Sequence, residues 1–170
     1  QYKMKNKSEE LVSNIHSKLF LKEFTFSTNE FYPEGPGSTK ELADNIVWID
    51  DIIIVNQIKE RENNKVSENY TKWYNSKIKR IAVTQIKNTL EYLKSYPSLI
   101  IKNDFGHSVD MSQIDTSHVI KTIIYNPKVN NDSKERFQKF YISKTGGFIH
   151  LFHIEDYSEL LRILITPAEI

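Results

Sequence analysis

The hydrophobic positions of the chain follow helical spacing in some stretches and cluster as strand-forming residues in others. Near the N-terminus, apolar residues recur at intervals of three and four after Ser8, at Leu11, Val12, Ile15 and Leu19. This spacing predicts a helix that Ser8 caps. A second, longer helix over about residues 66–94 is predicted by apolar residues at strict four-residue spacing, which are Tyr74, Ile78, Ala82, Ile86 and Leu90. Pro97 ends this helix.

Strands are predicted where β-branched and aromatic residues are concentrated. We expect a short strand at residues 24–26, a hairpin of residues 41–49 and 52–60, and a further strand at residues 119–125. Another hairpin, of residues 137–143 and 148–154, turns at Gly146 and Gly147. Helical spacing then predicts a short packing helix over residues 155–165, which is also a possible subunit interface.

The hairpin of residues 41–49 and 52–60 brings three polar side chains together. A turn at Asp50 and Asp51 pairs Ile46 with Val55, and the same register places Asp44 opposite Gln57. Lys59 follows Gln57 by two residues and therefore projects from the same face. One carboxylate, one amide oxygen and one ammonium converge in this register. The plainer interpretation is a half-buried hairpin with polar residues at its open end.

This Asp…Gln-x-Lys pattern resembles the PD-(D/E)xK nuclease superfamily, and is closest to its Mrr-like branch, which also carries Gln in the motif. The resemblance covers residues 8–125. It implies an α/β fold with a restriction endonuclease-like core of helix, three strands, helix and strand, here with additional C-terminal strands and a short helix. It also implies a nuclease that acts in defence against foreign DNA.

Phosphodiester hydrolysis needs a divalent cation that lowers the pKa of a water molecule, and a second positive charge that steadies the reacting phosphate. The resemblance implies that Asp44, the side-chain oxygen of Gln57 and the backbone carbonyl of Ile58 hold Mg²⁺ or Mn²⁺. Lys59 would position the water. Family members often add a glutamate from the first helix, and Glu10 is preferred here over Glu9.

The formal net charge of +1 favours no particular partner, but the charges are unevenly distributed. Residues 57–102 hold ten Lys or Arg against four Glu, whereas residues 23–56 hold one Lys against seven acidic residues. The basic block begins at the proposed site, so its cations are candidates for a phosphate track on DNA, with RNA left open. They are Arg61, Lys65, Lys72, Lys79, Arg80 and Lys87. The alternative is the solvated face of an ordinary helix.

The length of 170 residues predicts a single domain over residues 1–170. The chain lacks cysteine, which excludes thiol chemistry and disulfides and is compatible with a cytoplasmic location. No run is long and apolar enough to span a membrane. The chain does not begin with Met, so we expect it to be the N-terminal part or a fragment of a longer protein with a further domain. A homodimer is possible, since cutting two strands needs two sites.

These features predict a Mg²⁺-dependent endonuclease that hydrolyses DNA. Two alternatives stay open. The first is a catalytically silent nucleic-acid-binding module that keeps the fold but does not cleave, because a neutral amide replaces an anionic ligand at Gln57. The second is a protein-interaction domain in which the hairpin is purely structural.

Overall fold

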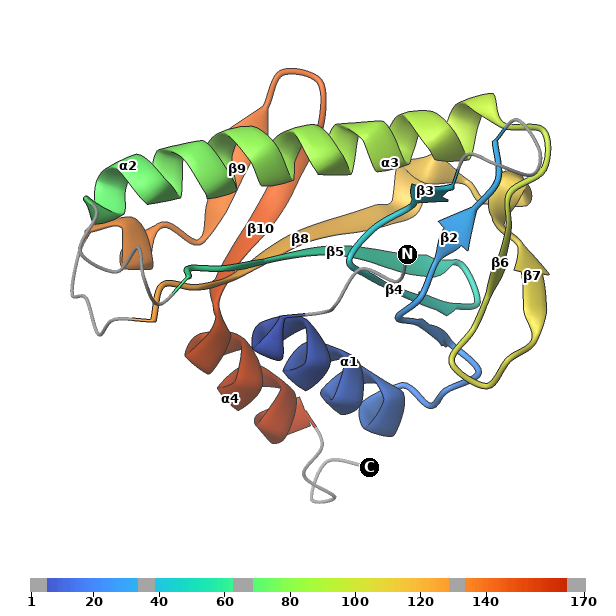
Figure 1. The fold of residues 1–170 in the computed structure, drawn as a ribbon, viewed down its shortest axis with the longest axis horizontal. Coiled ribbons are helices and arrows are strands. Elements are labelled where there is room, and N and C mark those ends of the chain that lie inside the picture. Colours follow the sequence, from blue (N-terminus) through green and yellow to red (C-terminus); the bar gives the residue numbers. More distant parts are fainter. Residues whose placement is uncertain (1–5, 34–38, 63–68, 129–133, 165–170) are drawn as a thin grey trace.

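A six-stranded mixed sheet forms the middle layer of the computed structural model, which describes residues 6–33, 39–62, 69–128 and 134–164 (Figure 1). Its strands lie in the order β1-β4-β5-β8-β10-β9. Their bounds are β1 (Thr25–Phe26), β4 (Asn45–Ile49), β5 (Ile52–Glu60), β8 (Val119–Asn126), β9 (Phe140–Ser143) and β10 (Gly147–His153). Strands β5, β8 and β10 are parallel, whereas β4 is antiparallel to both β1 and β5. The chain therefore has a mixed α/β fold.

The predicted register of the first hairpin is confirmed. Ile46 pairs with Val55, and the last pair joins Ile49 to Ile52, so the loop consists of Asp50 and Asp51. Asp50 has a φ of 53°, a left-handed conformation that two-residue turns require and that aspartate tolerates. Side chains alternate along β5, so those of Gln57 and Lys59 leave the sheet on one face and that of Ile58 on the other.

One face of the sheet is covered by a continuous helical segment over residues 70–95 (Figure 1). It comprises α2 (Tyr70–Tyr74), the π-helical segment η2 (Asn75–Ala82) and α3 (Val83–Ser95). The predicted apolar stripe is confirmed for Tyr74, Ile78, Ala82 and Ile86, which are all fully buried, whereas Leu90 is half-buried. In an α-helix each four-residue step overshoots a full turn by about 40°, so strict four-residue spacing would drift off the sheet. The wider π turns of η2 offset that drift.

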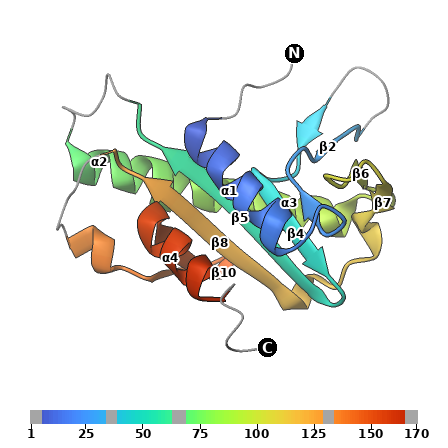
Figure 2. The same ribbon diagram turned by 90° about the horizontal axis from the view of Figure 1, so that it is seen from below.

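The opposite face is covered by α1 (Lys7–Leu19) and α4 (Ile154–Leu164), as Figure 2 shows. Val12 of α1 and Leu161 of α4 share a core cluster with Ile58 of β5. The prediction that Ser8 caps α1 is wrong. Asn6 is the cap and accepts a hydrogen bond from the backbone N–H of Glu9.

Two small ribbons flank the sheet beside β4. One joins β2 (Glu30–Phe31) to β3 (Lys40–Glu41), and the other joins β6 (Ile100–Lys102) to β7 (Ser108–Asp110). Short 3₁₀ segments follow at η3 (Met111–Gln113), η4 (Thr116–His118) and η5 (Lys134–Phe137). The second predicted hairpin forms from β9 and β10, and its first strand begins later than expected because residue 137 belongs to η5. Among the described residues, no helix is long and apolar enough to cross a membrane.

Candidate active site

Asp44 lies immediately before β4, at the point where the chain diverges from β5. Its side chain is buried, and Oδ2 accepts a hydrogen bond of 2.7 Å from the backbone N–H of Ile58. The last backbone pair of the hairpin joins Asn45 to Asn56. Just beyond it, the Asp44 carboxylate accepts a hydrogen bond from the backbone of β5. Gln57, one position further on β5, is also buried. Asp44 and Gln57 are thus adjacent, as the predicted register requires.

The ammonium of Lys59 lies among three oxygen atoms. Its Nζ is 2.7 Å from Asp44 Oδ2, 3.0 Å from the carbonyl oxygen of Ile58 and 3.3 Å from Gln57 Oε1. These are the three oxygens that the sequence analysis names as metal ligands. They converge on a single cation. Lys59 is held by direct contact with all three, and its side chain is 15% exposed.

The donor set has the chemistry that hard divalent cations prefer, since all three donors are oxygen atoms. It carries only one negative charge, that of Asp44. Within the described ranges, no group of three or more His, Cys, Asp or Glu side chains could hold a metal ion. A cation at this site would therefore rely on one carboxylate, one amide and one carbonyl, with water or substrate oxygen atoms completing its coordination.

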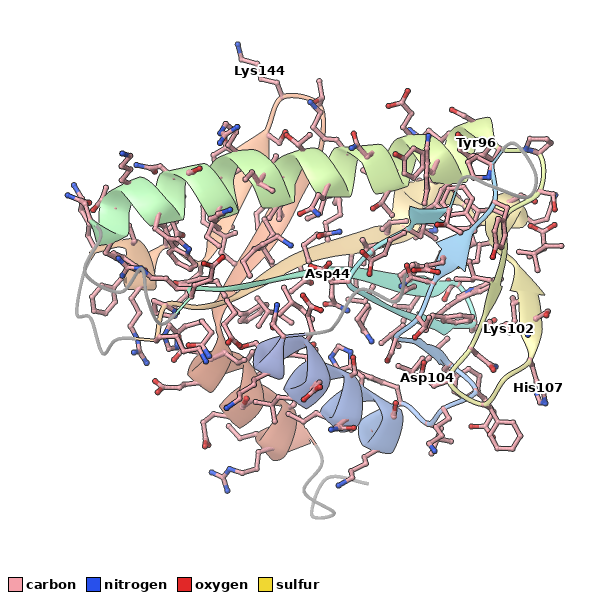
Figure 3. All side chains as sticks on the ribbon, viewed as in Figure 1. Asp44, Tyr96, Lys102, Asp104, His107 and Lys144 are labelled. Atoms are coloured by element: carbon pink, nitrogen blue, oxygen red, sulfur yellow. The ribbon has the colours of Figure 1, made fainter. Side chains whose placement is uncertain are left out.

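A pocket of about 210 Å³ opens beside Asp44, which Figure 3 labels, between residues of the hairpin and residues of α3. Three polar side chains of α3 line it, and these are Gln85, Asn88 and Tyr92. Gln85 Oε1 is buried and makes no hydrogen bond within the described structure. A buried amide oxygen of this kind needs a donor, and a water molecule or a substrate group in the pocket could supply it.

Sequence reasoning missed these α3 residues because a polar side chain on a helix is usually solvated. A signal was present, since residues 85, 88 and 92 recur at helical spacing on one side of the predicted apolar stripe. That spacing places them on one flank of the helix. Only the packing of α3 against the hairpin shows that this flank faces Asp44.

The structure does not bring Glu10 to this pocket. Glu10 is exposed on α1, and α1 packs on the face of the sheet that carries Ile58, opposite the face of Gln57 and Lys59. Glu9 is the buried glutamate of this helix, and its Oε1 accepts a hydrogen bond from Asn6 Nδ2. Among the described residues that line the pocket, no side chain comes from α1.

The basic residues proposed for a phosphate track divide into two groups. Arg61 requires a correction, because its side chain is 1% exposed and its guanidinium lies 5.9 Å from the ring centre of buried Trp73. It is a core residue. The other described members all lie on the long helix, where Lys72 and Arg80 are exposed and Lys79 and Lys87 are half-buried. Lys65 lies outside the described residues.

A buried polar network lies under the site, on the α1 face of the sheet. His16 Nδ1 is 2.6 Å from Asn45 Oδ1, and His16 Nε2 is 2.7 Å from the hydroxyl of Tyr157 on α4. Asn45 also accepts from Asn56 Nδ2. Burial lowers the pKa of His16 from 6.5 to about 4. The network fixes Asn45, the residue next to Asp44. The sequence gives no signal for this network, because a single histidine in a helix does not indicate its partners.

Comparisons of the chain with models of protein families, with curated proteins and with solved structures find no match.

Proposed function

We propose that the chain is a metal-dependent nuclease that hydrolyses phosphodiester bonds of DNA. One observation carries the proposal. The oxygens of Asp44, Gln57 and Ile58 lie within 3.3 Å of one cationic group, Lys59 Nζ, so they form a preassembled cation site at the surface of a sheet. Metal-dependent phosphodiester hydrolysis uses a divalent cation bound by oxygen ligands of this kind, and Lys59 would supply a second positive charge beside it.

The arrangement of elements supports the resemblance to the PD-(D/E)xK superfamily and its Mrr-like branch. Helix α1 precedes the three sheet strands β1, β4 and β5, and the long helix and β8 follow them. Asp44 precedes the second of these strands, and Gln57 and Lys59 lie on the third. The resemblance implies this order. A restriction endonuclease-like core is therefore part of the proposal.

Mg²⁺ or Mn²⁺, when bound, would stabilise charge on the phosphate and lower the pKa of a water molecule. Asp44 supplies the charged ligand, and the backbone N–H of Ile58 holds that carboxylate in place. Gln57 and the carbonyl of Ile58 supply neutral ligands. With a metal ion bound, Lys59 would be displaced from the three oxygens, and its ammonium would position the attacking water or the phosphate. Gln85 offers its unpartnered buried oxygen to a water molecule in the same pocket.

DNA is the proposed substrate because exposed cations lie on the same long helix whose flank lines the pocket. Lys72 and Arg80 are exposed there, and phosphates bind to such surfaces by displacing counterions. The contribution of each cation depends on salt, so we expect binding to weaken steeply as ionic strength rises.

The test is cleavage of supercoiled plasmid in Mg²⁺ and, separately, in Mn²⁺. We expect nicked or linear product from the wild-type protein and none from Asp44→Ala, because the only charged ligand is lost. Asp51→Ala is the matched control, since Asp51 is an exposed aspartate at the closed end of the same hairpin. Circular dichroism checks that both variants are folded. Equal cleavage by wild type and Asp44→Ala would refute the proposed site.

A second candidate is a catalytically silent nucleic-acid-binding module. The neutral Gln57 favours it, because the site then holds one carboxylate against one ammonium and has no net charge to attract a divalent cation. Salt-dependent DNA binding without cleavage in either metal would favour this candidate over the nuclease.

A further inference from the structure

Aromatic rings continue from the Asp44 pocket along the end of α3. Tyr92 lines that pocket, and its ring centre is 5.8 Å from that of Tyr96, one turn further along the helix. Phe31 of β2 packs edge-on against both rings, at 5.5 Å and 5.4 Å. Phe31 is buried and fixes the two tyrosines, while the tyrosines themselves are half-buried. They therefore present fixed ring surfaces next to the proposed site.

Two further hollows extend this surface away from Asp44. The first, of about 410 Å³, is lined by Tyr96 and Tyr32, and the second, of about 760 Å³, is lined by Tyr32, Phe105 and Lys102. Tyr32 and Ile100 line both hollows, so the two are adjacent, and the ring contact of Tyr96 with Tyr92 links the first hollow to the Asp44 pocket. Figure 3 shows Tyr96 and Lys102 on the same side of Asp44. The pocket and the two hollows together form what we call the aromatic groove.

Two further rings on the groove are exposed to solvent. Tyr32 is 63% exposed and Phe105 is 58% exposed, and both border the groove. Two cations accompany the rings. Lys40 Nζ lies 5.0 Å from the ring centre of Tyr92 and 6.0 Å from that of Tyr96, and Lys102 is exposed at the far hollow. Aromatic platforms with interspersed cations suit a strand whose bases and phosphates are both accessible.

Carboxylates also line the groove. Glu30 and Asp104 lie at the far hollow, and Asp104 accepts hydrogen bonds from Ser17 Oγ and from the backbone and hydroxyl of Ser27. Glu41 and Asp44 lie at the pocket, where Asp44 is paired with Lys59. Carboxylates repel the phosphates of a single strand and of a duplex alike, so they do not distinguish the two. Stacking on the rings does, because it needs unpaired bases.

We propose that the aromatic groove binds unpaired nucleotides of a nucleic-acid strand that enters the Asp44 pocket. As a statement about substrate, this rests on the proposed nuclease function, and it makes a single-stranded end, flap or gap the preferred target. A base-paired duplex hides the faces of its bases and leaves Tyr32, Tyr96 and Phe105 nothing to stack on.

The test is fluorescence anisotropy of a labelled oligothymidylate of about 15 nucleotides, in EDTA so that the strand is not cut. An oligouridylate of equal length and a duplex of equal length complete the set. Tyr32→Leu and Phe105→Leu each remove a ring, and we expect each to weaken single-strand binding about tenfold, whereas Tyr32→Phe keeps the ring and stays within about twofold of wild type. Phe137→Leu is the control, because Phe137 is 69% exposed in η5, at the opposite end of the molecule.

Weaker binding of either single strand by both Tyr32→Leu and Phe105→Leu supports the proposal. The oligonucleotide that binds more tightly shows whether the groove prefers DNA or RNA. Duplex binding as tight as single-strand binding overturns the inference, and so does unchanged binding by Tyr32→Leu and Phe105→Leu. The proposed nuclease function is tested separately, by cleavage of the plasmid and of a labelled single strand in Mg²⁺ or Mn²⁺. It fails if Asp44→Ala cuts as well as the wild type does, or if the wild type cuts neither substrate. If the protein binds single strands through Tyr32 but cuts no substrate, the proposal of the aromatic groove stands and the proposed nuclease function is refuted.

Discussion

Replacing Lys59 with methionine removes the ammonium from the three oxygens and keeps a side chain of similar length. Asp44, whose side chain is 2% exposed, then keeps the hydrogen bond from the Ile58 N–H but loses its ion-pair partner. Removing one partner of a fully buried pair costs about 3–5 kcal/mol. Lys59 is 15% exposed and water can replace part of the interaction, so we expect a loss of about 2 kcal/mol. For a domain of this size the melting temperature falls by about 4–8 °C.

Mn²⁺ should reverse this loss. If the proposed function holds, a divalent cation would compete in the wild-type protein with the Lys59 ammonium for the oxygens of Asp44, Gln57 and Ile58. Lys59→Met removes the competitor, so we expect the variant to bind Mn²⁺ about tenfold more tightly, which corresponds to about 1.4 kcal/mol. Metal that binds only the folded state raises its stability with concentration. The variant should therefore gain more stability from Mn²⁺ than the wild type gains, while its cleavage activity is lost.

Thermal unfolding over a series of Mn²⁺ concentrations measures this difference, and calorimetric titration gives the affinity directly. Lys72→Met is the matched control, because Lys72 is an exposed lysine on the long helix. The double variant Asp44→Asn with Lys59→Met should lose the response to Mn²⁺. Equal stabilisation of wild type and Lys59→Met by Mn²⁺ would show that the ammonium and the metal do not share a site.

Two further predictions concern stability. Buried His16 stays neutral down to its pKa of about 4, whereas in the unfolded chain it takes up a proton near pH 6.5, so the free energy of unfolding should fall between pH 6.5 and 4 by up to about 3 kcal/mol. Urea denaturation over this window should show a flatter profile for His16→Gln, and identical slopes would contradict the assignment. Ile86→Ala opens a cavity where α3 meets the sheet and should cost about 2–5 kcal/mol; a cost below about 1 kcal/mol would mean that the helix repacks.

The hairpin was predictable because its determinants are local. Two aspartates mark the turn, strand side chains alternate with a period of two, and any slip by one residue would exchange the side chains that face the long helix with those that face α1. Register then follows from chain positions alone, so the proximity of Asp44, Gln57 and Lys59 could be worked out from the sequence. The long helix was predictable for a similar reason, although four-residue spacing does not distinguish α from π turns.

Side-chain direction was not predictable where it depends on packing between distant segments. Counting charges placed Arg61 in the basic block, yet its side chain turns into the core beside Trp73. Glu9 and Glu10 are neighbours with equal helical propensity, and only the contact of α1 with the sheet decides which one is buried. The ribbons β2–β3 and β6–β7 are too short for periodicity to reveal, and they contribute much of the aromatic groove.

The pattern of three residues also predicted which oxygen atoms converge, without identifying the cation that they hold. A carboxylate and a lysine that face each other on neighbouring strands can form an ion pair when no other cation lies between them. Here Lys59 Nζ lies 2.7 Å from Asp44 Oδ2. An acidic residue at position 57 would leave a net negative charge on the site, and that charge would favour a divalent cation over the ammonium. With glutamine there, one charge balances the other. Gln57 would therefore make the competition between Lys59 and a metal ion close, and the Lys59→Met measurement tests that balance directly.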